Sequence, residues 1–362
     1  MKTKKNNKST KNNKSKLNSK NKKNNNRFIT PVEIVKKRNK MWYLYHDELK
    51  KNKSKKHILY DPLFITNDLF NLEPKISSSN SKTNFNFSDI TIGSAHYEEG
   101  PVGCTYIDFK NGARVYQDIR GGYTGNVTMN SVNNDFLVNG ICLAGGSLAG
   151  LEAITGSASE KMKEIDYFNL PVINGAIIKS NKIMTPGNMV YADKELGRFA
   201  VRNRNSGFMC NGQVGAGNTA LNGQGCAFKE ENGIKYLVIV INNALGDIYD
   251  DKNICIKKKY SKLKKEFQIT KELSSNTTLT VIITNIDLEH NRLEQMARQV
   301  HTSMGKNIRP FNTIQDGDIL YACSTKNKKI KLNSKQFIGL CSEMEKITEK
   351  AVINSVVKNN LL

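Results

Sequence analysis

The ten residues from Asn276 to Asn285 constrain the fold of this 362-residue chain more than any other stretch. From Thr278 onward they are mostly β-branched and apolar, and no glycine or proline interrupts the run. This pattern predicts a strand that is buried inside a sheet. The preceding segment, Lys257–Ser275, is polar and rich in lysine, which predicts an exposed connection that leads directly into the strand.

Thr277 stands at the head of this strand, next to the carbonyl of Asn276. A threonine in this position can attack the preceding carbonyl with its hydroxyl, so that the chain cleaves itself between the two residues. The freed α-amine, whose reference pKa is about 7.7–8.0, can then act as the base for the same hydroxyl. N-terminal nucleophile hydrolases place their active residue in this way. The alternative is that Thr277 is an ordinary strand residue, because threonine is common in strands.

Basic residues are concentrated at the N-terminus. Residues 1–60 contain twenty Lys and Arg but only three Asp and Glu, so about +17 of the net charge of +22 lies there. Residues 1–27 are almost wholly Lys, Asn and Ser and cannot bury enough apolar area to fold. We expect residues 1–30 to form a disordered basic arm, which either contacts nucleic acid or is a solvated tail. We expect residues 31–84 to hold a helix followed by a linker.

The chain contains seven cysteines, and no two of them have the Cys-x-x-Cys spacing of a metal site. Their odd number and scattered positions favour free thiols in a reducing compartment, so we expect a cytoplasmic protein. No apolar stretch is long enough for a signal peptide core or a membrane span. We therefore expect no metal, no other cofactor and no membrane partner.

Strands and helices alternate from about residue 85 to the C-terminus, which predicts layered sheets flanked by helices. Between them, residues 212–225 hold five glycines, which predicts a loop whose backbone approaches another part of the chain closely. The expected strands are 90–93, 104–109, 114–119, 236–241, 277–285 and 319–323, and the expected helices are 147–163, 194–203, 289–303 and 336–357.

Several of these pieces, in order along residues 86–325, resemble the nylon-oligomer-degrading 6-aminohexanoate-oligomer endohydrolases. These enzymes belong to the self-processing aminopeptidases that share the fold of ornithine acetyltransferase. The ordered set is specific, and residues 1–84 match nothing in it. The matching stretches are Gly93–Pro101, Ile141–Gly146, Asp193–Arg198, Gly223–Phe228, Asn276–Thr278, Ala297–Met304 and Asp316–Asp318.

The resemblance implies a four-layer α/β/β/α sandwich of the ornithine acetyltransferase type over residues 85–362. It also implies that the chain cleaves itself at the Asn276–Thr277 bond and that the two pieces stay folded together. The implied substrate is a small amide or peptide. The implied assembly is a homotetramer, because relatives form ring-like tetramers.

The resemblance also assigns roles to individual side chains. Thr277 would be the nucleophile, and the side-chain amide of Asn243 would donate to the oxyanion. Asp316 and Asp318 align with two family carboxylates that lie near the nucleophile. Paired carboxylates beside a terminal amine could orient it and hold its charge.

Two positions depart from the family pattern. The family carries a catalytic lysine in the loop after a Gly-Ala-Gly turn, but here Gly215–Asn218 runs almost directly into Gly223, and that lysine is absent. A family tyrosine at the end of an apolar strand aligns with Lys179. Lys179 either compensates for the absent lysine or is an ordinary solvated lysine at a strand end.

Two functions follow from these observations. The first is a threonine amidohydrolase or peptidase that acts on short oligomers or small peptides. The second is a catalytically inactive member of the family, a scaffold whose basic arm binds nucleic acid. The Asn276–Thr277 junction, Asn243 and both aspartates favour the enzyme, whereas the absent lysine favours the scaffold.

Overall fold

The structure, a computed structural model, describes residues 67, 72–129, 131, 133, 135–164, 170–179, 190–220, 222–258, 260 and 276–356. The expected basic arm and the helix expected after it lie outside these residues. Most of the lysine-rich connection before the central strand also lies outside them.

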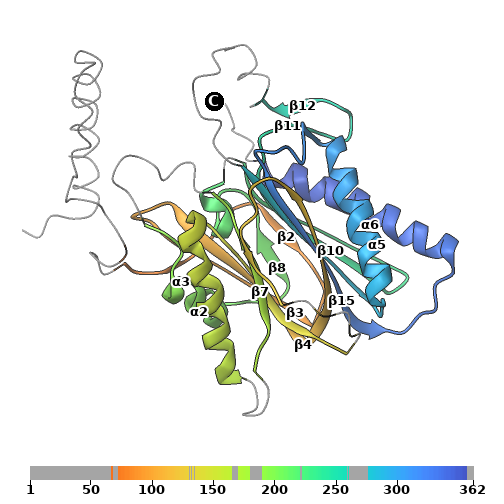
Figure 1. The fold of residues 1–362 in the computed structure, drawn as a ribbon, viewed down its shortest axis with the longest axis horizontal. Coiled ribbons are helices and arrows are strands. Elements are labelled where there is room, and N and C mark those ends of the chain that lie inside the picture. Colours follow the sequence, from red (N-terminus) through yellow and green to blue (C-terminus); the bar gives the residue numbers. More distant parts are fainter. Residues whose placement is uncertain are drawn as a thin grey trace, which may run out of the picture.

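Two sheets that share one long strand form the centre of the molecule (Figure 1). The shared strand is β4 (Val102–Gly121), which pairs with β3 and β6 along its first half and with β15 along its second half. The first sheet also contains β3 (Ile90–Tyr97), β6 (Val138–Ala144), β7 (Ile173–Ile177) and β5 (Asn126–Val127). The second continues from β4 through β15 (Gly317–Lys328), β13 (Thr277–Ile286), β10 (Ile234–Asn243) and β9 (Gly223–Glu231).

Three separate apolar cores arrange these elements in four layers. One core lies between the two sheets, and a second lies between the second sheet and the helices α5 (His290–Ser303) and α6 (Ser334–Ser355). The third lies between the first sheet and the helices α2 (Leu151–Lys161) and α3 (Lys194–Arg202). Figure 1 shows the two helix pairs on opposite sides of the strands. The predicted α/β/β/α fold is therefore confirmed.

The predicted central strand, β13, is buried along its whole length because both of its faces are covered. Leu279, Val281 and Ile283 belong to the core between the sheets, whereas Ile282 belongs to the core under α5 and α6. A strand that is covered on both faces needs a continuous apolar sequence rather than an alternating one. This double burial is the physical reason for the run that dominates the sequence.

The two strands expected over 104–109 and 114–119 are one strand, β4. The pairing register shifts between Asp108 and Ala113, and Gly112 adopts a φ of +72°. The glycine thus marks a bulge within the strand rather than its end. Beyond the bulge, β4 pairs once more with β6, at Ala113, and then with β15 from Arg114 onward.

Part of the expected linker belongs to the folded body. β1 (Lys75–Ile76) pairs with β3, and β2 (Lys82–Asn84) pairs with β8 (Phe208–Cys210). Ser77 is buried, and its hydroxyl accepts from the Gly215 N–H at 3.0 Å and lies 2.9 Å from His96 Nδ1. The N-terminal boundary of the body therefore lies before residue 85, and His96 supports the glycine-rich loop through Ser77.

The remaining elements are short. They are β11 (Asp247–Tyr249), β12 (Cys255–Lys257), β14 (Ile308–Arg309) and the 3-10 turns η2 (Ser147–Gly150), η3 (Met162–Glu164), η4 (Gly215–Asn218) and η5 (Met304–Lys306). None of the helices in the described parts of the chain has the length and apolar character needed to cross a membrane.

Candidate active site

Thr277 is the first residue of β13 and lies where the space between the two sheets ends. It is directly opposite Asn243 in the β10–β13 pair, so the two side chains lie on the same face of the sheet. The next residue of β13 on that face, Leu279, packs in the core between the sheets. Thr277 and Asn243 therefore form a buried polar end to this apolar layer.

The carbonyl of Asn276 receives two hydrogen bonds. The Thr277 hydroxyl donates to it at 2.6 Å, and the Gly317 N–H donates to it at 2.8 Å. The Asn276 N–H in turn donates to the Gln315 carbonyl at 2.8 Å, so this segment lies parallel to the start of β15. A backbone donor is thus already in contact with the oxygen that would become negative if the hydroxyl attacked.

Only glycine fits between the two aspartates of the Asp-Gly-Asp stretch. A Cβ atom on Gly317 would lie 1.8 Å from the Tyr123 carbonyl oxygen. The N–H groups of Gly122 and Tyr123 donate to the Asp316 carbonyl at 2.7 and 3.0 Å. The turn at the end of β4 therefore fixes the direction of the Gly317 N–H. Sequence reasoning missed this donor, because a backbone N–H has no signature beyond the glycine itself.

Asp316 is buried beside the Asn276 backbone, with which it forms an isolated parallel bridge. One of its carboxylate oxygens accepts from the Leu245 N–H at 3.2 Å, and the other accepts from the Thr313 hydroxyl at 2.6 Å. These bonds hold the carboxylate at the end of β10 and next to the bond that is expected to be cleaved.

Asp318 is also buried, and it accepts from the N–H groups of Thr278 at 2.6 Å and Asn312 at 3.2 Å. Burial and the neighbouring Asp316 carboxylate raise the pKa of Asp318 from 3.8 to about 8, although the two N–H donors act in the opposite direction. At neutral pH, Asp318 therefore carries a proton in the uncleaved chain. The two aspartates flank the peptide backbone on either side of Thr277.

The structure places Asn243 beside Thr277 but directs its amide elsewhere. Asn243 Nδ2 donates to the Lys179 carbonyl at 3.1 Å, while the Asn276 carbonyl accepts from Gly317. Asn243 thereby joins the end of β10, in the second sheet, to the segment that follows β7 in the first sheet.

Lys179 and Thr277 line the same cavity, whose volume is about 430 Å³. This volume is in the range of small-molecule sites. Lys179 as a whole residue is partly buried there. The residues that line the cavity are Gly122, Tyr123, Thr124, Gly125, Ser147, Leu148, Ile177, Lys179 and Thr277.

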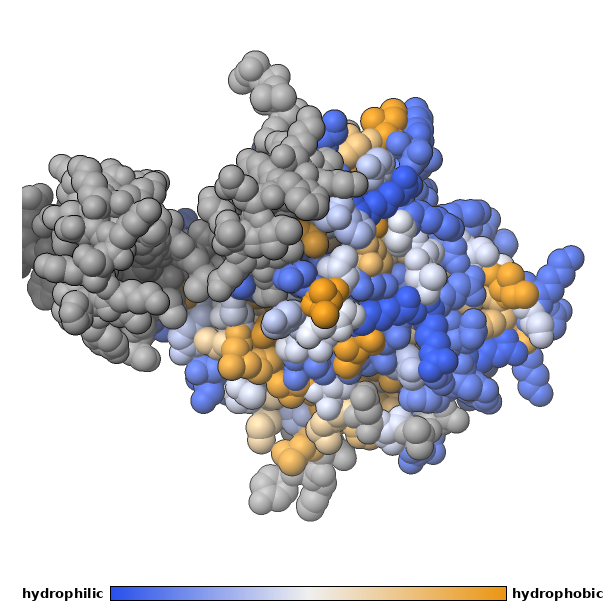
Figure 2. Space-filling model, turned by 45° about the horizontal axis from the view of Figure 1, so that its top comes forward, coloured by the Kyte–Doolittle hydropathy of each residue, from blue (hydrophilic) through white to orange (hydrophobic). Residues whose placement is uncertain are grey.

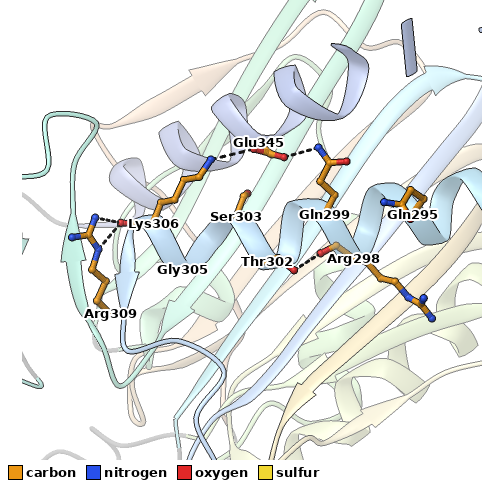
Figure 3. A pocket seen from close by; sticks show the side chains of 9 residues that line it. All are labelled: Gln295, Arg298, Gln299, Thr302, Ser303, Gly305, Lys306, Arg309 and Glu345. Carbon is orange, nitrogen blue, oxygen red and sulfur yellow. Dashed lines mark hydrogen bonds and ion pairs between the residues drawn. The ribbon is translucent and has the colours of Figure 1, made fainter. Parts of the chain in front are cut away.

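A larger hollow of about 810 Å³ lies along α5 (Figure 3), and Thr277 is not among the residues that line it. Its polar side chains bind one another: Gln299 donates to Glu345 at 2.8 Å, and Lys306 lies 3.3 Å from the same carboxylate. Arg309 donates to the Lys306 carbonyl at 2.8 Å. We place the candidate active site at the smaller cavity, because it contains the predicted nucleophile.

Within the residues that the structure describes, no group of three or more His, Cys, Asp and Glu side chains is arranged to hold a metal ion. All seven cysteines are free, and six of them are buried.

Comparison with known proteins establishes the family. The family model of peptidase family S58 matches residues 89–361. The chain belongs to peptidase family S58. Its relatives include 6-aminohexanoate-oligomer endohydrolases from Agromyces sp. (strain KY5R) and Paenarthrobacter ureafaciens. Each is 33% identical over 288 residues, which are 72% of this chain and 79% of the relative. The resemblance stated from the sequence is confirmed.

Solved structures of low sequence identity share the fold. A Burkholderia sp. beta-aminopeptidase is 13% identical, with a TM-score of 0.57 over 77% of this chain and 89% of that one. The L-aminopeptidase D-Ala-esterase/amidase from Ochrobactrum anthropi, described as a variant of the Ntn hydrolase fold, is 16% identical. It has a TM-score of 0.56 and covers 74% and 83% of the two chains. This S58 peptidase is therefore a hydrolase of amide bonds with the N-terminal nucleophile fold.

Proposed function

We propose that this S58 peptidase cleaves itself between Asn276 and Thr277 and then uses Thr277 to hydrolyse amide bonds in short oligomers or small peptides. The observation that carries the proposal is the arrangement at the Asn276 carbonyl. The Thr277 hydroxyl lies 2.6 Å from its oxygen, and the Gly317 N–H donates to the same atom at 2.8 Å. The nucleophile and a donor for the developing oxyanion are thus positioned before the reaction begins.

Self-cleavage follows from this geometry in two steps. Thr277 Oγ1 attacks the Asn276 carbonyl carbon, and the carbonyl oxygen becomes negative beside the Gly317 N–H. The hydroxyl proton passes to the Thr277 nitrogen and the C–N bond breaks, which leaves an ester between the two residues and a neutral amine on Thr277. Water hydrolyses the ester and releases a carboxylate on Asn276 and a free amine on Thr277.

Cleavage changes the charge next to the two aspartates. Thr277 carries no charge before cleavage, and Asp318 is then protonated at neutral pH because its pKa is about 8. A new ammonium group on Thr277 would favour the ionised form of Asp318 and lower its pKa. We propose that Asp316 and Asp318 then orient the amine, which takes the hydroxyl proton when substrate binds. Asn243, opposite Thr277, is proposed as a second donor to the oxyanion of the substrate.

Amide hydrolysis by matched variants tests the proposal. Thr277→Ala should remain uncleaved and inactive, whereas Thr277→Ser should still cleave itself because the hydroxyl is retained. Asn243→Ala should fold and lose about 10²–10³ in turnover, the usual effect of removing one oxyanion donor. Thr280→Ala, in the same strand, is the matched control and should cleave itself normally. Amide hydrolysis by the Thr277→Ala protein would overturn the proposal.

We further propose that the enzyme is a cytoplasmic homotetramer. The seven free cysteines support a reducing compartment. Residues 61–362 carry only about +5 of the net charge of +22, so subunits can approach closely. On the face shown in Figure 2, apolar side chains lie in small separate groups among polar ones, which is compatible with a partly polar interface. Sedimentation should give a tetramer, and a monomer at micromolar concentration would contradict this.

A further inference from the structure

We propose that the cavity beside Thr277 selects amide substrates that carry a free carboxylate, and that the ammonium group of Lys179 binds this carboxylate. The inference rests on the proposed function, because it names the substrate class of the same site. Three features of the cavity support it: the charge of Lys179, the hydrogen bonds that hold the backbone at Lys179, and the apolar side chains in the wall.

Lys179 is the only charged side chain among the described residues that line the cavity. The nearest acidic groups to Thr277, Asp316 and Asp318, are at most 1% exposed and accept hydrogen bonds from neighbouring donors. Their oxygens are therefore not offered to a ligand in the cavity. A substrate that ends in an ammonium group would meet a like charge here, whereas a carboxylate would meet an opposite charge.

The backbone from Ile177 to Lys179 is hydrogen-bonded to both sheets. The Lys179 carbonyl accepts from Asn243 Nδ2 at 3.1 Å. The preceding Ile178 and Ile177 N–H groups donate to the carbonyls of Ala144 at 2.9 Å and Gly125 at 3.0 Å. Because the Lys179 side chain lines a cavity, an anion bound there would be screened less by water and salt than an anion at an open surface lysine.

The rest of the cavity wall suits an aliphatic chain. Tyr123 and Leu148 line the cavity and are 63% and 74% exposed, so a bound chain would cover apolar surface that now meets water. The volume of about 430 Å³ corresponds to about fourteen heavy atoms, at about 30 Å³ for each water-sized group. The fitting substrate is thus a short aliphatic amide with a carboxylate a few atoms from the bond that is cleaved.

Binding of three simple probes tests the inference without any turnover. The protein is the full-length Thr277→Ala chain, which keeps the uncleaved state that contains the cavity. We expect pentanoate to bind at least 10-fold more tightly than pentanol in ligand-observed NMR titrations, because a hydrogen bond to a charged group changes affinity by about 10- to 150-fold. Pentylamine should bind most weakly of the three.

Charge variants of Lys179, made in the same background, assign the preference to this side chain. Lys179→Met should remove the preference for pentanoate over pentanol, and Lys179→Glu should favour pentylamine. Lys306→Met, in the hollow along α5, is the control and should leave all three affinities unchanged. Equal binding of the three probes, or a preference for pentanoate that survives Lys179→Met, would overturn the inference.

Hydrolysis by the wild-type enzyme gives an independent measurement. Two aliphatic amides that differ only in a terminal carboxylate or carboxamide are compared, and the carboxylate form should have at least a 10-fold higher kcat/KM. Hydrolysis of both at equal rates refutes the carboxylate preference but leaves the proposed function intact. Hydrolysis of neither, together with selective binding of pentanoate, contradicts the proposed function and supports the inference.

Discussion

Replacing Asp318 by asparagine in the uncleaved Thr277→Ala chain should change how the stability of the fold depends on pH. Burial and the Asp316 carboxylate raise the pKa of Asp318 from 3.8 to about 8 in the folded chain. The folded chain therefore holds one more proton than the unfolded chain between these two values. The stability that comes from this proton is fully present below pH 3.8 and is lost as the pH rises towards 8.

The size of the effect follows from the two pKa values. While the folded chain is protonated and the unfolded chain is not, the free energy of unfolding falls by about 1.4 kcal/mol per pH unit. Between pH 5 and pH 7 the loss is up to about 3 kcal/mol, or roughly 6 °C in the thermal midpoint at about 2 °C per kcal/mol. Asparagine cannot ionise, so the variant lacks this contribution.

Thermal unfolding of the Thr277→Ala chain with and without Asp318→Asn, at pH 5, 6 and 7, measures this difference. Asparagine has only one acceptor oxygen, so its side-chain NH2 group will lie opposite one of the two backbone N–H donors, from Thr278 or Asn312. The loss of this hydrogen bond lowers the free energy of unfolding by the same amount at every pH. The midpoint of the asparagine variant relative to its parent should nevertheless rise by roughly 6 °C between pH 5 and pH 7.

The exposed Asp251 provides a matched control, because Asp251→Asn in the same background should leave the pH dependence unchanged. If the Asp318→Asn curve runs parallel to that of its parent from pH 5 to pH 7, Asp318 is ionised in the folded chain. The account of the paired aspartates would then be wrong.

Two further changes test the backbone around the site. Gly317→Ala should prevent self-cleavage, because its Cβ would lie 1.8 Å from a carbonyl oxygen, whereas Gly305→Ala should cleave normally, because no atom lies within 4 Å of its Cβ. Gel electrophoresis measures the cleavage, and a fully cleaved Gly317→Ala protein would contradict the proposed role of the turn. Deleting residues 1–71 should leave a stable body. Deleting residues 1–84 also removes Ser77, so the buried Gly215 N–H loses its acceptor. The free energy of unfolding should fall by about 1–3 kcal/mol, and the melting midpoint should fall with it. Equal midpoints for the two truncations would show that β1 and β2 are dispensable.

The sequence predicted most of the fold because its strands and helices carry regular apolar patterns. The run from Leu279 to Ile283 predicted a buried strand, and the structure confirms it in the centre of the second sheet, with both faces covered. The sequence predicted two strands, 104–109 and 114–119, where the structure has one, because a glycine such as Gly112 gives the same local signal at a bulge and at a strand end. The strands within residues 75–84 are too short and too polar to be recognised without their partners.

The candidate site was predicted less completely. Thr277 was predicted from its place at the head of the apolar strand, whereas Asn243 and the two aspartates came from the resemblance. The structure brings all four to one end of the sheet. The Gly317 N–H could not be predicted, because the parallel alignment of two distant segments places it. The direction of the Asn243 amide also depends on a carbonyl in the other sheet, far away in the sequence.

N-terminal sequencing of the purified wild-type protein identifies the nucleophile. We predict two chains, of which the smaller begins Thr-Thr-Leu-Thr-Val at Thr277, and a single uncleaved chain for Thr277→Ala. A wild-type protein that remains one full-length chain, or a small fragment that begins at Ser274, Ser275 or Thr278, would contradict the assignment of Thr277 as the nucleophile.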